Sequence, residues 1–340
     1  MLEKILLGTY TRGASQGIYT IELDTNKKAL SNLTLVAKEN SPTYLAQSQA
    51  KNLYNVTAVN DQGGVAAYNS HYHLLNTVTK VGAPLCFLAI DEKRQLVYGA
   101  NYHKGEVNVY QILADGSLEA TDSICHKEAT GPHENQDHAH AHYAGLTTDG
   151  RLAVCDLGTD RIYTYDVSAQ GKLTEVSQWI APAGTGPRHL IFHPNGKIAY
   201  LFGELDSSVT VLSYDTTSAS FTSLEKLPTI PEAFTHFNSG SAIRITKDGK
   251  FLYLSNRGHN SITVFAVNDS GEQLTYVQNI PTEGDFPRDF NLNADDHFLV
   301  CGHQNSDNLT LFERDIQTGQ LTLIEKDIYA PECVCVLFAK

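Results

Sequence analysis

The sequence predicts an all-β fold, a seven-bladed β-propeller formed by a single domain over residues 1–340. Three observations support this fold. A unit of short apolar strands and polar turns recurs at intervals of about 42 to 56 residues, close to the repeat length of propeller blades. No segment shows a helical periodicity of useful length. The many nearly continuous apolar runs are typical of strands that are buried on both faces.

The clearest repeat begins at Pro187 and reads PRHLIFHPNGKIAYLFGELDSSVTVLSYD. Apolar runs at 189–193 and 198–202 predict two strands joined by a tight turn, and the alternation at 209–213 predicts a third. The other copies show the same order of strand, turn and strand. We expect the seven first strands to begin near Pro42, Pro84, Ala139, Pro187, Ser241, Pro287 and Pro331.

The last repeat contains only one strand, PECVCVLF, which starts at Pro331. At the other end of the chain, residues 3–9, 17–23 and 30–38 have the pattern of a second, third and fourth strand. We therefore expect the N-terminal strands to pair with the C-terminal strand in a shared blade that closes the ring. Closure would hide strand edges that otherwise invite pairing with other chains.

Composition excludes several classes of function. The chain has 25 Lys and Arg against 38 Asp and Glu, a net charge of −13 with its 14 His neutral. Nucleic-acid backbones need dense basic residues, so no nucleic-acid partner is expected, and an anionic membrane surface is disfavoured for the same reason. No run reaches the ~18 apolar residues of a membrane helix, and the N-terminus lacks the pattern of a secretory signal.

The six cysteines have no zinc-site spacing, and we expect them to be reduced core residues of a cytoplasmic protein. No pattern specifies an oligomeric state. Motifs for dinucleotides, phosphate loops, serine nucleophile elbows and zinc proteases are absent.

Histidines are concentrated in the segment HENQDHAHAH. His138, His140 and His142 alternate, so on an extended strand they would point to one side. Such a group suits general acid–base catalysis or metal binding. A solvated loop with incidental histidines is the alternative.

Charged residues stand at the ends of predicted inner strands. Arg188 and His189 open one first strand, and an arginine there is costly to bury unless it meets a carboxylate of the protein or an anionic ligand. The same Pro-Arg pair recurs at Arg288. Glu204 and Arg257 follow the second strands of successive repeats, where a turn with a salt bridge is the plainest alternative. We expect His140, Arg188, Glu204 and Arg257 on one rim of three adjacent blades.

The segments GTYT, SPTYLA, GANYHKGEVNVY, HENQDHAHAH, GPRHLIFHPNGKIAYLFGEL and GKFLYLSNRGHNSITVF span the chain. Through them the sequence resembles the seven-bladed β-propeller lactonase family, which includes a bacterial type of 6-phosphogluconolactonase and is similar to fungal carboxy-muconate lactonising enzymes. The resemblance implies hydrolysis of an anionic sugar lactone, 6-phospho-D-glucono-1,5-lactone, in the pentose phosphate pathway. It implies no cofactor and no metal.

The resemblance also implies a site made of His140, Arg188, Glu204 and Arg257. We expect Glu204 to act as general base, with apolar strands raising its pKa toward neutrality. His140 would protonate the leaving ring oxygen or hydrogen-bond the oxyanion. Arg188 and Arg257 would hold the phosphate or the oxyanion.

His142, His189 and Arg288 are further candidates for substrate binding. Three other functions stay open at this point. The first is a lactonising isomerase or a lactonase for another sugar. The second is a metal-dependent lactonase with ligands among His138, His140 and His142. The third is a non-enzymatic scaffold, although the Trp-Asp signature of scaffold propellers is missing.

Overall fold

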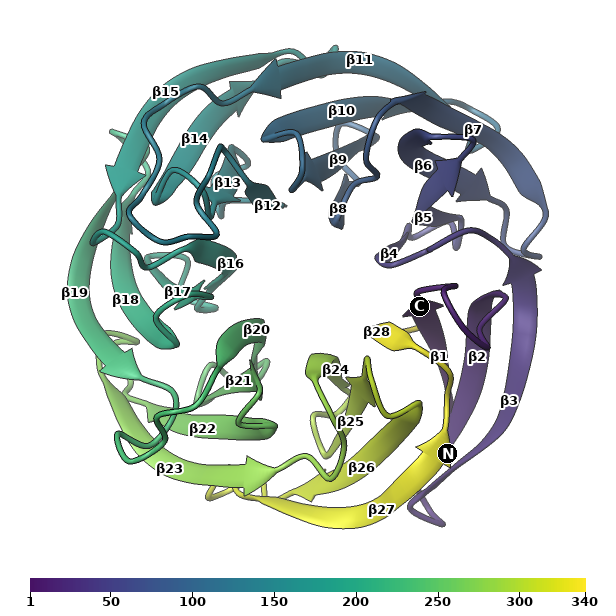
Figure 1. Cartoon of the computed structure of the whole chain (residues 1–340), viewed down its shortest axis with the longest axis vertical. Coiled ribbons are helices and arrows are strands. Elements are labelled where there is room, and N and C mark those ends of the chain that lie inside the picture. The colour runs from purple at the N-terminus through teal and green to yellow at the C-terminus, as the bar shows by residue number, and fades with distance from the viewer. The chain divides into compact units, whose positions relative to one another are not determined.

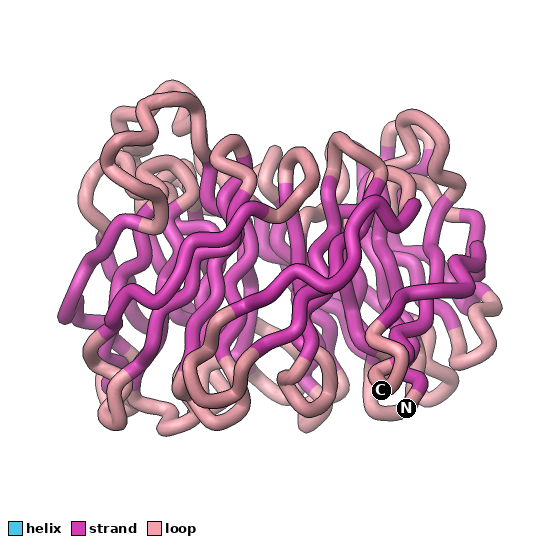
Figure 2. The backbone as a smooth tube through the Cα atoms, turned by 90° about the horizontal axis from the view of Figure 1, so that it is seen from below, coloured by secondary structure: helices cyan, strands magenta, loops and turns pink.

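The computed structural model describes residues 1–340, which form 28 strands and no helix. Figure 2 shows these strands in magenta and the connecting loops in pink. The strands make seven four-stranded sheets, so the fold is the predicted seven-bladed β-propeller. No helix of the kind that crosses a membrane is found in the structure.

Each sheet is one blade, and Figure 1 labels its strands. The blade shared by both chain ends contains β28 (Cys333–Phe338), β1 (Leu2–Thr9), β2 (Gly17–Asp24) and β3 (Ala29–Lys38). The next two contain β4 (Leu45–Gln47), β5 (Leu53–Val59), β6 (Gln62–Tyr68) and β7 (Leu74–Val81), then β8 (Phe87–Asp91), β9 (Leu96–Asn101), β10 (Glu106–Ile112) and β11 (Leu118–Cys125). They are followed by β12 (Ala141–Leu146), β13 (Leu152–Asp156), β14 (Arg161–Val167) and β15 (Leu173–Ile180), and by β16 (Pro187–Phe192), β17 (Ile198–Gly203), β18 (Ser208–Asp215) and β19 (Ser220–Pro228). The last two contain β20 (Ser239–Ile245), β21 (Phe251–Arg257), β22 (Ser261–Val267) and β23 (Leu274–Pro281), then β24 (Pro287–Leu292), β25 (Phe298–His303), β26 (Asn308–Arg314) and β27 (Leu321–Tyr329).

The chain falls into two compact units. The first comprises Met1–Lys38, Ile191–Ser213 and Ser223–Ala339, and the second comprises Glu39–Leu190, Tyr214–Thr222 and Lys340. The single domain expected over residues 1–340 stays a prediction.

In the first unit, β28 pairs antiparallel with β1, and the register joins Ile5 to Phe338 and Gly8 to Cys335. Figure 1 shows the yellow β28 beside the purple β1. Leu7 and Val336 belong to one buried cluster in this unit. The predicted closure by the two chain ends is therefore confirmed.

The carboxylate of Glu332 reinforces this closure, because it accepts hydrogen bonds from the backbone N–H groups of Arg12, Gly13 and Ser15 at 2.9, 2.9 and 3.1 Å. These three N–H groups lie in the loop between β1 and β2. The residue before β28 thus ties the C-terminal strand to the N-terminal hairpin as well as to the strand edge.

Buried tyrosines on second strands recur in both units. Each donates its hydroxyl to the carbonyl oxygen of a glycine in a turn: Tyr54 to Gly116 at 3.1 Å, Tyr200 to Gly271 at 2.7 Å, and Tyr253 to Gly319 at 2.8 Å. The three glycines have φ values of +89°, +82° and +73°, a conformation that strains other residues. The carbonyl oxygen of the recurring turn glycine therefore accepts a hydrogen bond from a buried tyrosine hydroxyl, which would otherwise lack a partner.

All six cysteines are free, as expected, but they are not all core residues. Four are buried, Cys86 is only partly buried and Cys125 is exposed. Cys125 ends β11, an outer fourth strand whose residues are largely uncovered. The expectation was wrong for this position because outer strands pack on one face only.

The pairing of β1 with β28 predicts a stability difference within one strand. Leu7 is 1% exposed and Leu2 is 62% exposed. Leu7→Ala is expected to lower the free energy of unfolding by about 2–5 kcal/mol, because it removes buried methyl groups and leaves a cavity. The exposed Leu2→Ala is the control, and thermal unfolding of the two variants checks the difference. Equal unfolding temperatures for Leu7→Ala and Leu2→Ala would contradict the burial of Leu7.

Candidate active site

Glu204 and Arg257 form an ion pair in the first unit, in which Arg257 is buried and Glu204 is partly buried. Glu204 follows β17 and Arg257 ends β21. Arg257 Nη2 lies 2.9 Å from Glu204 Oε2, with the two side chains 5% and 16% exposed. The same Nη2 donates to Ser239 Oγ at 2.6 Å and to the carbonyl oxygen of Gly240 at 2.7 Å. This guanidinium is held by a carboxylate and two neutral acceptors.

Burial is the largest influence on this arginine and lowers the pKa of Arg257, while Glu204 raises it and the like charge of Arg288 lowers it further. The ring of Phe286 lies 5.4 Å from the guanidinium carbon and covers one side of it. The pair therefore sits in surroundings with little water, where charge interactions are strong.

Gly240 allows the two strand ends to approach. A Cβ at this position would lie 2.6 Å from the carbonyl oxygen of Gly203 and 2.8 Å from the ring of Phe202. The backbone N–H of Gly240 donates to the carbonyl oxygen of Glu204 at 2.9 Å. The start of β20 thereby fixes the backbone that carries the Glu204 carboxylate.

Arg288, the second residue of β24, is only partly buried and has a neutral partner. Its Nη1 donates to Gln304 Oε1 at 3.1 Å, and its guanidinium carbon lies 5.6 Å from the centre of the Tyr10 ring. The backbone carbonyl of Arg288 accepts a hydrogen bond from Ser241 Oγ at 2.6 Å. The backbone of Arg288 is therefore fixed by a hydrogen bond. None of these contacts pairs its guanidinium with a carboxylate.

His303 ends β25, the strand position that Arg257 occupies in β21. Its Nδ1–H donates to the carbonyl oxygen of Asn308 at 3.0 Å, and Cys301 Sγ lies 3.8 Å from Nε2. Burial lowers the pKa of His303 to about 4. The imidazole is therefore neutral throughout the physiological range.

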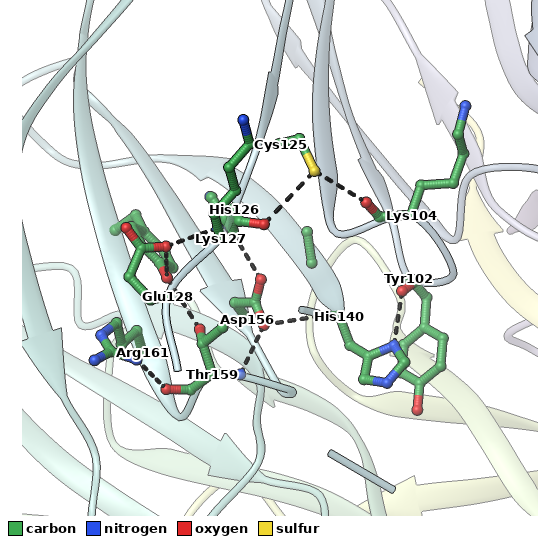
Figure 3. Close-up of polar contacts among 12 residues, drawn as sticks. Tyr102, Lys104, Cys125, His126, Lys127, Glu128, His140, Asp156, Thr159 and Arg161 are labelled. Atoms are coloured by element: carbon green, nitrogen blue, oxygen red, sulfur yellow. Dashed lines mark hydrogen bonds and ion pairs between the residues drawn. The ribbon is translucent and has the colours of Figure 1, made fainter. Parts of the chain in front are cut away.

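In the second unit, His140 precedes β12 and is nearly fully buried (Figure 3). Its Nδ1–H donates to the carbonyl oxygen of Tyr102 at 2.8 Å, and Nε2 lies 2.8 Å from Asp137 Oδ1. Its ring stacks on the ring of Tyr102 with centroids 4.1 Å apart. These contacts fix both the tautomer and the orientation of the imidazole.

A buried carboxylate anchors the backbone of His140. Asp156 Oδ1 accepts from the N–H of His140 at 2.8 Å and from the N–H of Thr159 at 3.0 Å. Its Oδ2 lies 2.6 Å from His126 Nδ1, and His126 Nε2 lies 2.9 Å from the hydroxyl of Tyr165. Figure 3 shows Asp156 between His126 and His140. Asp156 thus positions His140 through the main chain, whatever the role of the ring.

Arg188 and His189 are buried on β16, with Arg188 Nη1 3.4 Å from His189 Nε2. The His189 ring meets the rings of Phe87 and His142 edge-on, with centroids 5.3 and 5.2 Å apart. His142 in turn meets the Tyr102 ring at 5.9 Å. In this unit, two imidazole rings, a guanidinium group and two aromatic rings therefore lie in contact with one another as one cluster.

The structure brings Glu204 together with Arg257, and Arg188 together with His189 and His142. His138 lies beside His140, with ring centroids 4.0 Å apart, but it is exposed. That all of these residues serve one substrate stays a prediction.

Sequence reasoning missed Asp137, Tyr102 and the pair of Asp156 with His126. Tyr102 follows its second strand as Glu204 follows β17, so a comparison across all repeats would have found it. Asp137 is adjacent to the alternating histidines in the sequence. His126 gave no local signal, because it meets Asp156 across 30 residues of sequence.

The seven four-stranded antiparallel sheets define the protein as a β-propeller. Charged residues at the ends of second strands, such as Glu204 and Arg257, give it a polar site. The chain belongs to the seven-bladed β-propeller lactonase family, whose model matches residues 4–338.

The relatives cover the chain almost completely. It is 43% identical over 339 residues to a protein of Bacillus subtilis named 6-phosphogluconolactonase, covering 98% of this chain and 97% of the relative. A crystal structure of a protein from Lactobacillus plantarum has 50% identity and a TM-score of 0.98, with 100% of both chains covered. The periplasmic gluconolactonase of Pseudomonas aeruginosa has 28% identity and a TM-score of 0.93, covering 100% of this chain and 99% of that one.

The lowered pKa of His303 predicts a loss of stability in acid. Between about pH 6.5 and pH 4 the unfolded chain binds a proton at this histidine and the folded chain does not, so the free energy of unfolding falls with falling pH. At about 1.4 kcal/mol per pKa unit, the total loss approaches ~3 kcal/mol. NMR titration of the ring checks the pKa, and His303→Gln should flatten this part of the stability profile. Protonation of His303 near pH 6.5 would contradict the account.

Proposed function

We propose that the protein is a lactone hydrolase that converts 6-phospho-D-glucono-1,5-lactone and water into 6-phosphogluconate. Membership in the lactonase family and the name of the Bacillus subtilis relative support this substrate. The ion pair of the partly buried Glu204 with the buried Arg257 is the observation that carries the proposal, because it offers an ionised carboxylate beside a site for negative charge.

Glu204 acts as the general base. A lactone carbonyl needs a water nucleophile, and a base that removes a proton from this water speeds its attack. The guanidinium of Arg257, 2.9 Å away, favours the ionised carboxylate, which is the form that a base requires.

His140 supplies the proton to the leaving ring oxygen. Its Nδ1–H is committed to the carbonyl oxygen of Tyr102, so Nε2 is the nitrogen that exchanges protons. Water attacks the carbonyl carbon, the bond from this carbon to the ring oxygen breaks, and His140 protonates that oxygen. The proton taken up by Glu204 restores the balance when it returns to His140 through solvent.

The arginines bind the anionic groups. Arg288 has a neutral partner in Gln304 and is the better candidate for the phosphate, whereas Arg257 already faces Glu204. Arg188 is assigned to the oxyanion, and His142 and His189 to contacts with the sugar. A role in the pentose phosphate pathway and a cytoplasmic location belong to the same proposal, and six free cysteines support a reducing compartment.

A lactonase for an unphosphorylated sugar is the second candidate. The Pseudomonas aeruginosa structure, described as a gluconolactonase, favours it. The two functions differ in whether a second anion site contributes to binding.

The role of Glu204 predicts a large loss of rate in Glu204→Gln. Removal of a working general base typically costs ~10²–10⁴-fold. Glucose-6-phosphate dehydrogenase can generate the phospholactone, and the appearance of 6-phosphogluconate is then compared with spontaneous opening. The exposed Glu119→Gln should keep the parent rate. If Glu204→Gln also keeps it, Glu204 is not the base, and if the parent protein adds nothing to spontaneous opening, the substrate is wrong.

Phosphate binding by Arg288 predicts a selective effect on KM. Arg288→Gln should raise KM for 6-phosphogluconolactone at least tenfold and leave KM for gluconolactone nearly unchanged, because only the first substrate carries the phosphate. Steady-state kinetics with both lactones check this, and Arg12→Gln provides a control arginine that is more exposed. Equal changes for both substrates would remove the assignment.

A further inference from the structure

Three potential metal ligands lie close together in the segment just before β12 in the sequence. Asp137 Oδ1 lies 2.9 Å from His138 Nδ1 and 2.8 Å from His140 Nε2. The three ligand atoms all lie within 4.8 Å of one another. Sequence reasoning considered His138, His140 and His142 as ligands, and the structure replaces His142 by Asp137.

The outer nitrogens of both histidines are occupied by backbone carbonyls. His140 Nδ1 lies 2.8 Å from the carbonyl oxygen of Tyr102, and His138 Nε2 lies 3.0 Å from the carbonyl oxygen of His103. A carbonyl oxygen only accepts, so each ring must carry a hydrogen on its outer nitrogen. In the neutral rings, both inner nitrogens therefore present bare lone pairs to the Asp137 carboxylate.

Three facing acceptors repel one another unless a positive charge lies among them. Metal-binding histidines commonly donate their second N–H to a backbone carbonyl, which fixes the tautomer and orients the lone pair. Here two histidines do so, to the carbonyls of consecutive residues, and the only formal charge of the set is the carboxylate. The arrangement thus provides both the ligands and the contacts that orient them.

Two glycines hold the ligand segment in place. A Cβ on Gly105 would lie 2.6 Å from the Cβ of Ala139, and a Cβ on Gly158 would lie 1.8 Å from the carbonyl oxygen of His138. The segment therefore packs directly against the turns after β9 and β13. Asp156 also accepts a hydrogen bond from the backbone N–H of His140. The backbone that carries the three ligands is therefore fixed by packing and by hydrogen bonding.

We propose that Asp137, His138 and His140 bind one divalent cation of the zinc type. Imidazole and carboxylate ligands suit Zn²⁺ and Co²⁺ better than Mg²⁺ or Ca²⁺, which prefer oxygen ligands alone. Zinc bonds of about 2.0–2.2 Å place tetrahedral ligands about 3.3 Å apart, so the ligands shift by less than ~1 Å. Asp137 is 70% exposed and is free to make this shift. Three protein ligands leave a position open for water.

The cation and the catalytic proton are alternative occupants of one atom, His140 Nε2. Metal binding itself does not depend on the proposed hydrolysis. A metal site would correct the expectation, implied by the resemblance, that no metal is bound.

The test is a titration of the full-length protein after dialysis against a chelator. Calorimetry with Zn²⁺ and visible absorption with Co²⁺ should show one saturable site per chain. Asp137→Asn and His138→Ala should each weaken binding at least tenfold, and both residues are exposed, so their variants should keep the parent unfolding temperature. NMR should show the His140 and His138 rings shifting on addition of Zn²⁺.

The double variant His71→Ala/His73→Ala is the matched control, because it removes an exposed histidine pair with the same spacing. It should bind Zn²⁺ like the parent. Absence of saturable binding, equal weakening in this control, displacement of Zn²⁺ by equimolar Mg²⁺, or rings that respond to protons but not to Zn²⁺ would each overturn the proposal. Loss of lactonase activity alone would not, so the two proposals fail separately.

Discussion

The antiparallel pairing of β1 with β28 is the contact on which the closed blade depends. β1 already pairs with β2 on one side, so without β28 its other edge would present unpaired N–H and C=O groups. Glu332 and Asp289 add charge-assisted bonds to this join, the latter by accepting the N–H of Val336 at 2.8 Å. Because one ladder joins residues more than 300 positions apart, its formation carries the entropy cost of closing a loop of nearly the whole chain.

Two carboxylates, Glu204 and Asp156, differ in burial. Glu204 faces a guanidinium and is partly buried, with 16% of its side chain exposed. Asp156 is fully buried and uses both oxygens on partners within the protein. Breaking a buried pair by removing one partner typically costs ~3–5 kcal/mol. Asp156 is therefore a structural support for His140, whereas the proposed role of Glu204 as general base relies on its partial exposure.

The repeat pattern predicted the strands closely because each strand has its own alternation and turn signal. Residues 3–9, 17–23 and 30–38 were expected as strands, and β1, β2 and β3 occupy Leu2–Thr9, Gly17–Asp24 and Ala29–Lys38. Comparison of equivalent positions also singled out Glu204 and Arg257, which form an ion pair in the structure. Contacts such as His140 with Tyr102, 38 residues apart, could not be predicted, since loop conformation and not strand pattern brings them together. The exposure of Cys125 was missed because alternation does not distinguish an outer strand from an inner one.

The shared blade has a consequence for biosynthesis. β1 is translated more than 300 residues before its partner β28. Until β28 has been made, any sheet that β1, β2 and β3 form during synthesis keeps one edge uncovered. A stop codon just before Cys333 would remove β28 and leave β1 without its neighbour on that edge.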